Sequence, residues 1–172
     1  MVSAVKKSNR AVYQQAQQNS QLTGMGTTFT CLVRCGLRIY IGHVGDSRAY
    51  LLRGNTFTQL TKDHSLVTEM VRQGKITTAE AKVHPDRNII TRAVGSQEEI
   101  EVDACIEQIE ENDMVLLCSD GLTNMVPEEN IKQILLSDCS LEQKADWLIA
   151  SAKEKGGIDN ISVIVLGLEV KQ

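Results

Sequence analysis

The sequence predicts an α+β protein in which antiparallel sheets carry helices on their outer faces. Three observations lead to this fold class. Two strand–turn–strand patterns come first along the chain, a helical and polar region follows them, and the last third returns to strands. This order differs from the regular strand–helix alternation of a parallel sheet. The chain has 172 residues, 42% of them hydrophobic, so we expect a single domain over residues 1–172 with a core of its own.

The first sixty residues contain one predicted helix and two predicted hairpins. Residues 3–19 lack glycine and proline and are rich in alanine, glutamine and lysine, which favours a helix. Gly36 separates the first two strands, and Gly54–Asn55 is typical of a tight hairpin turn between the next two. β-Branched and aromatic residues are frequent in the four predicted strands, which are residues 27–35, 37–44, 48–53 and 56–60.

The rest of the chain alternates predicted helices with strands. Thr77 with Glu80 has the spacing of a capping box at a helix start, and Ser140 with Gln143 has the same spacing. A helical, polar segment of about residues 65–95 lies between strands and is predicted to be an insertion on the rim. The expected helices are residues 65–73, 77–84, 127–136 and 140–155. The expected strands are residues 100–106, 113–118 and 161–170.

Charge and hydropathy argue against several classes of protein. The net charge is −4 and no basic block is present, which disfavours a nucleic-acid partner. The longest apolar run, residues 161–168, is far too short to span a bilayer, so no membrane partner is expected. Lys6, Lys7 and Arg10 have no apolar segment behind them, so the beginning of the chain does not look like a secretory signal. We therefore expect a cytoplasmic protein.

The cysteines are odd in number and lack paired C-x-x-C spacing. Most of them lie among apolar residues, so we expect buried free thiols in a reducing cytosol. A zinc site is poorly supported because histidine and aspartate partners at zinc-like spacing are missing. The five cysteines are Cys31, Cys35, Cys105, Cys118 and Cys139.

Three aspartates lie at the ends of predicted strands, each beside glycine, serine or asparagine. Asp46 and Asp120 follow strands, and Asp159 precedes one. If the three strands were neighbours in the sheets, the three carboxylates would converge. Carboxylates without cationic partners suit a hard cation such as Mg²⁺ or Mn²⁺ better than zinc or copper. The alternative is that each aspartate is an ordinary turn or cap residue that bonds its own backbone.

Six stretches of the sequence resemble the metal-dependent serine/threonine protein phosphatases of type 2C, and the bacterial single-domain branch most closely. The resemblance covers residues 24–166, nearly the whole chain, and the order and spacing of the stretches agree as well. The stretches are GMGTT, HVGDSRAYLLR, LTKDHSLVTEMVRQGKIT, HPDRNIITRAVG, DMVLLCSDGLTN and DNISVIVL.

The resemblance implies two packed antiparallel sheets flanked by helices, with a metal centre in a cleft at one sheet edge. It implies hydrolysis of phosphoserine and phosphothreonine by metal-activated water, with no side-chain nucleophile and with two to three Mn²⁺ or Mg²⁺ ions. The substrates would be phosphorylated proteins, those of a cognate serine/threonine kinase. The segment 65–95 matches the bacterial flap, which borders the cleft and influences substrate access.

The family's site residues carry over onto matching positions. Asp120 and Asp159 match metal-binding aspartates of a dinuclear centre, and Asp46 matches an aspartate that helps to hold a further, weaker ion with Asp120. Asn160 is expected to orient the last ligand. Gly121 is expected to let the chain turn away after Asp120. Ser119, which lies outside any G-x-S-x-G motif, is expected to shape the loop rather than to act as a nucleophile.

The sequence also departs from the family pattern. The R-x-x-N-E-D and D-G-M-G-G-H motifs, which supply a phosphate-gripping arginine and two further metal-binding aspartates, are missing from these residues together with the strands that carry them. We therefore expect a truncated, partial catalytic domain with weak metal binding and weak or no turnover. Exposed sheet edges would favour self-association. The alternative function is a non-catalytic pseudophosphatase or partner-binding module.

The three histidines are expected to have local roles. His43 should pack or hydrogen-bond within its strand, and His64 in KDHS should belong to a helix cap. His84 should be extended before Pro85.

Two arginines and one tryptophan complete the set of candidate residues. Arg48 and Arg92 are candidates to hold anions, although Arg48 is expected to pair with a nearby acid such as Asp46. Trp147 is expected to face the core from an amphipathic helix.

Overall fold

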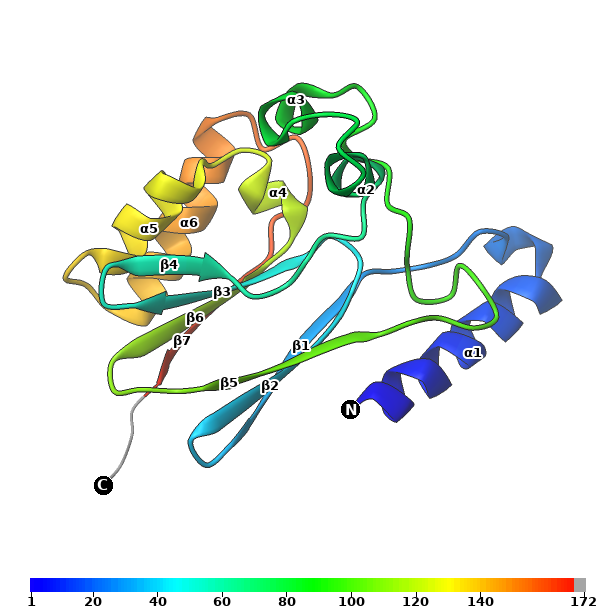
Figure 1. Ribbon diagram of the computed structural model, residues 1–172, viewed down its shortest axis with the longest axis horizontal. Helices are drawn as coiled ribbons and strands as arrows, with labels where there is room; N and C mark the ends of the chain where they lie inside the picture. Colours follow the sequence, from blue (N-terminus) through cyan, green and yellow to red (C-terminus); the bar gives the residue numbers. More distant parts are fainter. Residues whose placement is uncertain (169–172) are drawn as a thin grey trace. The chain divides into compact units, whose positions relative to one another are not determined.

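The computed structural model describes residues 1–168 and contains two antiparallel sheets flanked by helices, as predicted (Figure 1). The first sheet has the order β1-β2-β5, formed by β1 (Phe29–Cys35), β2 (Arg38–Val44) and β5 (Asp103–Gln108). The second has the order β4-β3-β6-β7, formed by β3 (Arg48–Arg53), β4 (Thr56–Gln59), β6 (Asp113–Cys118) and β7 (Val163–Leu168). The helices are α1 (Val2–Gln18), α2 (Leu66–Arg72), α3 (Thr78–Val83), α4 (Asp120–Thr123), α5 (Glu128–Leu136) and α6 (Leu141–Glu154), with a 3₁₀ turn at Ser20–Leu22.

The chain divides into two compact units, each with hydrophobic clusters of its own. The first unit comprises Met1–Cys31, Gly42–Asp46 and Lys62–Ala104. The second comprises Leu32–Ile41, Ser47–Thr61 and the described residues from Cys105 onwards.

The core of the first unit forms where helix α1 meets the chain that follows the flap. Val5 of α1 packs with Val44, Val94 and Ile100. Asn9, fully buried on the same helix, donates from Nδ2 to the carbonyl oxygens of Gln97 and Glu98 (3.0 Å each) and accepts from the amide of Gly95 (2.7 Å). Both polar atoms of this buried amide are therefore hydrogen-bonded, as a buried polar group requires.

The flap segment contains helices α2 and α3, whose starts agree with the predicted caps. The Ser65 hydroxyl accepts from the amide of Thr68. Thr77 and Glu80 form a complete capping box at the start of α3. His84 follows α3 in an extended conformation, as expected before Pro85.

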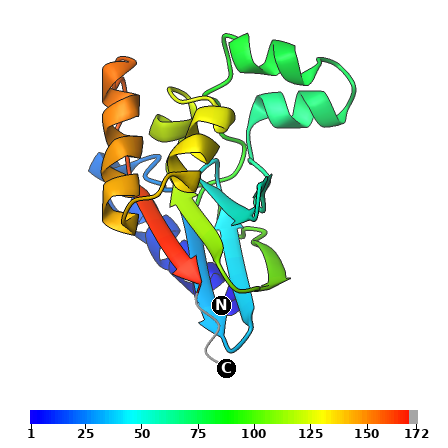
Figure 2. The same cartoon turned by 90° about the vertical axis from the view of Figure 1, so that its left-hand side faces the viewer.

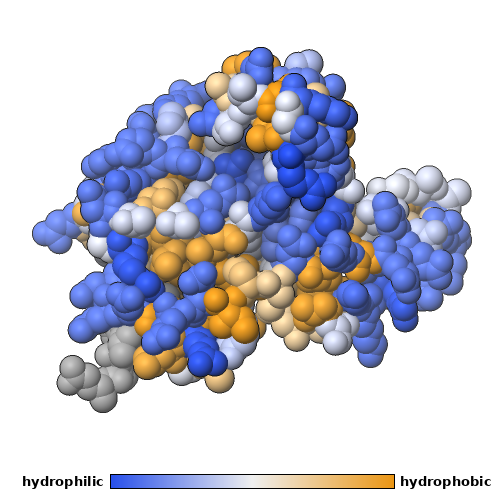
Figure 3. Space-filling view, in the orientation of Figure 1, coloured by the Kyte–Doolittle hydropathy of each residue, from blue (hydrophilic) through white to orange (hydrophobic). Residues whose placement is uncertain are grey.

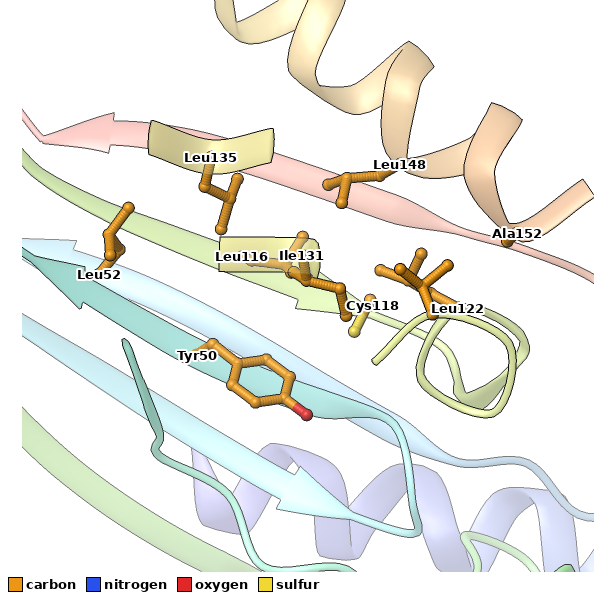
Figure 4. Close-up of a cluster of buried hydrophobic side chains, with 10 residues drawn as sticks. Tyr50, Leu52, Leu116, Cys118, Leu122, Ile131, Leu135, Leu148 and Ala152 are labelled. Carbon is orange, nitrogen blue, oxygen red and sulfur yellow. The ribbon is translucent and has the colours of Figure 1, made fainter. Parts of the chain in front are cut away.

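The second unit has a hydrophobic cluster on each face of its four-stranded sheet. On one face, Ile39 and Ile41 of β2 pack against Ala49 and Leu51 of β3 and Val115 of β6, so this cluster joins the two sheets. On the other face, helices α5 and α6 lie side by side (Figures 1 and 2). Figure 4 shows the cluster beneath them, whose buried members are Tyr50, Leu52, Leu116, Cys118, Leu122, Val126, Ile131, Leu135, Leu148 and Ala152.

Tyr50 links this cluster to the start of α5. Its ring is stacked on Phe57, and its buried hydroxyl donates to Glu128 Oε1 and accepts from Arg48 Nη1, both at 3.0 Å. Burial, which disfavours the phenolate, raises the pKa of Tyr50 well above its usual value. The hydroxyl therefore stays protonated and available as a donor.

The predicted strand at residues 100–106 begins later than expected, at Asp103. Ile100 is buried with Val5 in the core of the first unit, and Val102 packs against the same cluster. Their apolar alternation therefore reflects packing against a helix rather than pairing in a sheet. Residues 169–170 of the last predicted strand lie outside the described residues.

The prediction that Trp147 faces the core is wrong, because 47% of its surface is exposed. The buried positions of α6 are Lys144, Leu148 and Ala152, which repeat every four residues on one face. Trp147 precedes Leu148 by one position, which places it about 100° around the helix from that face.

The three-stranded sheet exposes apolar side chains. Val33, Leu37 and Ile106 are 51%, 49% and 59% exposed. Figure 3 shows apolar surface over β1, β2 and β5. Among residues 1–168, no helix is both long enough and apolar enough to cross a membrane.

Lys144 is an unusual core residue because it is a lysine with 4% of its surface exposed. Its ammonium group donates to the carbonyl oxygen of Leu135 (2.8 Å) and also to that of Ser137. The last carbonyl groups of a helix have no partner within the helix, so Lys144 of α6 caps the end of α5.

We predict that Lys144→Met lowers the free energy of unfolding by about 1–3 kcal/mol, since it leaves buried carbonyl groups without a donor. Urea unfolding followed by circular dichroism measures this change. Lys153→Met, at an exposed position of the same helix, is the matched control and should have a much smaller effect. Equal effects of the two substitutions would contradict the capping role.

Candidate metal centre

Asp120 and Asp159 lie at the same end of two neighbouring strands. Cys118, the last residue of β6, pairs with Val163, the first residue of β7. The chain leaving β6 and the chain entering β7 therefore run beside each other. Asp120 begins the short helix α4, two residues after β6 ends, and Asp159 lies four residues before β7 begins.

Ser119 joins these two loops by hydrogen bonds. Its amide donates to the carbonyl oxygen of Ser162 (3.0 Å), and its hydroxyl donates to that of Asn160 (3.1 Å). The same hydroxyl oxygen accepts from the amide of Ser162 (3.0 Å). The expectation that Ser119 shapes the loop therefore agrees with its contacts.

Gly121 allows the two loops to approach closely. A Cβ atom at this position would lie 2.3 Å from the carbonyl oxygen of Asn160. Gly121 lies within helix α4, so the expectation that it lets the chain turn away is wrong. The glycine is required by the space between α4 and the Asn160 backbone rather than by a turn.

The Asp120 carboxylate lies in an environment that disfavours its charge. Burial and the negative charge of Asp159 raise its pKa, and they outweigh the backbone amide of Gly121 and the side chain of Asn124, which favour the ionised form. Asn124 donates from Nδ2 to Asp120 Oδ2 at 3.1 Å. Asp159 is exposed and accepts from the amide of Asn160 at 2.7 Å.

The donor set of this site fits a hard divalent cation. Asp120 and Asp159 repel each other, as the raised pKa of Asp120 indicates, and a dication between them would turn that repulsion into attraction. Both groups offer only oxygen, which suits Mg²⁺ or Mn²⁺. Within residues 1–168, however, no group of three or more histidine, cysteine, aspartate or glutamate residues is placed to hold a metal ion. The site therefore supplies two carboxylates.

The other predicted site residues have different places. Asp46 is half-buried and belongs to the first unit, so its role as a metal ligand stays a prediction. Asn160 contacts Asp159 through its backbone amide, and the orienting role of its side chain likewise stays a prediction. Asn124 was missed by the sequence analysis. Its spacing of four residues from Asp120 would have indicated it, had residues 120–124 been recognised as helical.

The remaining candidates are placed as follows. His43 hydrogen-bonds locally, to the Thr30 hydroxyl (2.9 Å) and the Lys62 carbonyl oxygen (3.1 Å), as predicted. His64 is not part of a cap: the cap of α2 is Ser65, and the His64 ring is buried and turned towards Gly45. The sequence could not distinguish the two because they are adjacent in KDHS.

Arg48 contacts Tyr50 and lies 3.6 Å from Glu128 Oε1. Its pairing with Asp46 stays a prediction. The five cysteines, all within the described residues, form no disulfide. Cys118 is buried as expected, whereas Cys35 is exposed, so the expectation of buried thiols is wrong for Cys35.

Comparisons with known proteins agree with this architecture. The model of the protein phosphatase 2C family matches residues 1–73. The serine/threonine phosphatase stp of Listeria welshimeri is 44% identical over 168 residues, which cover 98% of this chain and 67% of the relative. Protein phosphatase PhpP of Streptococcus pneumoniae is 41% identical over 160 residues, covering 93% of this chain and 65% of PhpP.

Solved structures show the same fold. The crystal structure of the serine/threonine phosphatase Stp1 from Staphylococcus aureus superimposes with a TM-score of 0.94 at 37% identity, covering 98% of this chain and 66% of Stp1. The catalytic domain of the phosphatase PstP, solved in complex with two manganese ions, has a TM-score of 0.86 at 38% identity, covering 95% and 68% of the two chains.

The fold, the two neighbouring carboxylates and these similarities define a metal-dependent phosphatase scaffold. The chain belongs to the protein phosphatase 2C family of serine/threonine phosphatases. It is similar to the bacterial members of that family and spans about two thirds of their length.

We predict that Gly121→Ala lowers the free energy of unfolding by about 1–3 kcal/mol, because the new methyl group would displace the Asn160 backbone. Urea unfolding measures the loss. Gly167→Ala is the control, since its methyl group would meet only the flexible end of the Leu141 side chain, at 3.3 Å. Equal stabilities for the Gly121 variant and the unmodified chain would show that the loops are not in close contact.

We predict that Asp120→Asn stabilises the metal-free chain, and that this advantage grows as the pH rises. The pKa of Asp120 is raised in the folded state, so the native carboxyl stabilises the fold at low pH and loses that contribution as the pH rises through the folded pKa. Urea unfolding in a chelating buffer at about pH 4 and about pH 7.5 tests this. A variant that is less stable than the unmodified chain at the higher pH would contradict the repulsion between Asp120 and Asp159.

Proposed function

We propose that the chain carries the catalytic centre of a metal-dependent phosphatase that hydrolyses phosphoserine and phosphothreonine in proteins. The observation that carries this proposal is the pair of electrostatically coupled carboxylates, Asp120 and Asp159, at one end of β6 and β7 on the phosphatase 2C scaffold. The names of the relatives, serine/threonine phosphatase and protein phosphatase, support the reaction and the substrate class.

Mn²⁺ or Mg²⁺ is the proposed cofactor. The all-oxygen donor set and the two manganese ions in the PstP structure support this choice. When bound, such an ion lowers the pKa of water and offsets charge on the phosphoryl group. No nucleophilic side chain is needed for this reaction, which agrees with the structural contacts of Ser119 to Asn160 and Ser162.

The chain's own residues hold and orient the donor oxygens. Asp120 and Asp159 would be the metal-binding carboxylates. Asn124 donates to one oxygen of Asp120, and the Asn160 amide donates to one oxygen of Asp159. The backbone amide of Gly121 also bonds the Asp120 carboxylate, so its position is fixed from two directions. Asp46 is proposed as a ligand of a further, weaker ion.

We expect the 172-residue chain by itself to bind metal weakly, with a dissociation constant roughly in the millimolar range of low-affinity sites. Two carboxylates give fewer charged oxygens than a hard cation needs for tight binding. Because the reaction depends on the metal ion, we also expect this chain to hydrolyse phosphorylated substrates weakly or not at all.

A non-catalytic, partner-binding module is the second candidate. Exposed apolar side chains favour it: Val33 and Ile106 on the three-stranded sheet, and Leu37 in the turn between β1 and β2. In the described part of that sheet, β1 and β5 are the outer strands, and an outer strand can pair with another chain. Self-association through such an edge is part of this proposal.

The proposed partners are phosphorylated proteins, the substrates of a cognate serine/threonine kinase. The cytoplasm is the proposed location, because cysteines that form no disulfide suit a reducing compartment.

We predict that Asp120→Asn reduces Mn²⁺ affinity and any Mn²⁺-dependent release of phosphate from a phosphothreonine peptide by a factor of at least about ten. Calorimetric titration with Mn²⁺ and a phosphate-release assay measure the two effects. Asp146→Asn, at an exposed position of α6, is the control and should change neither. Mn²⁺ binding by the unmodified chain that is insensitive to Asp120→Asn would refute the proposed centre, whereas no binding at all would favour the non-catalytic module.

A further inference from the structure

His64 holds Gly45, the residue directly before Asp46, by two hydrogen bonds. The amide of His64 donates to the carbonyl oxygen of Gly45 at 2.8 Å. The amide of Gly45 donates to Nδ1 of the His64 ring at 3.0 Å. Both backbone polar groups of Gly45 are therefore bound by one residue.

Gly45 has a conformation that other residues rarely adopt. Its φ angle is +115°, and a Cβ atom here would lie 2.5 Å from Cγ2 of Thr28. Glycine adopts this conformation without strain, but it also has more alternative conformations than any other residue, so partners are needed to hold it in this one. The two bonds from His64 supply them.

The His64 ring is also held at its second nitrogen, Nε2, by a contact with Asp103. Since Nδ1 accepts a hydrogen bond, the ring hydrogen lies on Nε2, which is 3.2 Å from Asp103 Oδ2. Arg92 donates from Nη1 to the other carboxylate oxygen, Oδ1, at 2.7 Å. The Asp103 carboxylate is therefore the common acceptor of the His64 ring and the Arg92 guanidinium group.

The Asp103 carboxylate stays ionised in this arrangement. Its partial burial raises its pKa, but hydrogen bonds and charge from His64 and Arg92 outweigh the burial and leave the pKa below its usual value. The negative charge favours the hydrogen on Nε2 of His64 and leaves Nδ1 free to accept from Gly45.

The neighbouring His43 ring packs beside the His64 ring. Its centroid is 4.9 Å from that of His64, and its own two nitrogens bond Thr30 and Lys62. His64 is 7% exposed. The ring therefore has little freedom to leave Gly45.

We propose that His64 is a positioning residue for Asp46: through Nδ1 it fixes the backbone at Gly45, and through Asp103 and Arg92 it connects that backbone to the end of the flap. This inference rests on the proposed function, in which Asp46 binds metal. The flap also contacts His64 directly, since the Thr91 amide donates to the His64 carbonyl oxygen at 2.8 Å.

A matched pair of variants separates the effect of the Nδ1 contact with Gly45 from that of the Nε2 contact with Asp103. In His64→Asn, the side-chain oxygen takes the place of Nδ1 and can still accept from Gly45, while the contact with Asp103 is lost. In His64→Gln, the amide group reaches the place of Nε2 and can still bond Asp103, while the acceptor for Gly45 is lost. Each variant is thus the control for the other.

The test is titration with Mn²⁺ alone, with free Mn²⁺ measured by electron paramagnetic resonance, together with hydrogen exchange of the Gly45 amide by NMR in the metal-free chain. We expect His64→Gln to weaken Mn²⁺ binding by about ten-fold or more and to speed exchange at Gly45, because the partner that holds the ligand's backbone is lost. His64→Asn should stay within about three-fold of the unmodified chain in both measurements.

The two proposals fail in different ways. Equal effects of the two variants, or no effect of either on a chain that binds Mn²⁺, would overturn the positioning role and leave the metal-centre proposal standing. An unmodified chain that binds no Mn²⁺ at all would overturn both.

Discussion

The close approach of the Ser119–Gly121 segment to the backbone of Asn160 is the contact on which the candidate centre depends. Ser119 bonds the opposite loop through both its amide and its hydroxyl, and Gly121 leaves room for the Asn160 carbonyl oxygen. This contact keeps two carboxylates, Asp120 and Asp159, in mutual repulsion at the end of β6 and β7. Carboxylates with perturbed pKa values cluster at functional sites, and in the proposed function this pair binds a cation.

The strands behind this contact are rigid because both faces of β6 are packed. Val115 belongs to the cluster that joins the two sheets, and Leu116 belongs to the cluster beneath α5 and α6 (Figure 4). Lys144 holds α5 in place at its C-terminal end, and Tyr50 holds it at its N-terminal end through Glu128. The packing on both faces of β6 therefore holds the apolar strand before Asp120 in place and resists small displacements of the carboxylate.

The first unit adds two buried hydrogen-bond networks to its apolar cluster. Asn9 ties α1 to the chain after the flap, and His64 ties the flap to Gly45. Both side chains are buried and both have partners on each polar atom. Buried polar networks of this kind are geometrically specific, because any displaced member leaves an unpaired group in a poorly solvated place.

The sequence by itself determined the fold class, the hairpins, the helix caps and the family, since these follow from local patterns of polarity, glycine and capping residues and from ordered motifs. It also indicated Asp120 and Asp159 as acids at strand ends. Only the tertiary structure decided which acids meet, because that depends on the pairing of Cys118 with Val163, and pairing partners are set by long-range packing. The sequence likewise does not show which face of α6 is covered, nor that the Asn160 backbone lies against Gly121, because both depend on contacts between separate segments of the chain. For His64, the decisive neighbours lie at positions 45 and 103, far away along the chain, so no local pattern could reveal them.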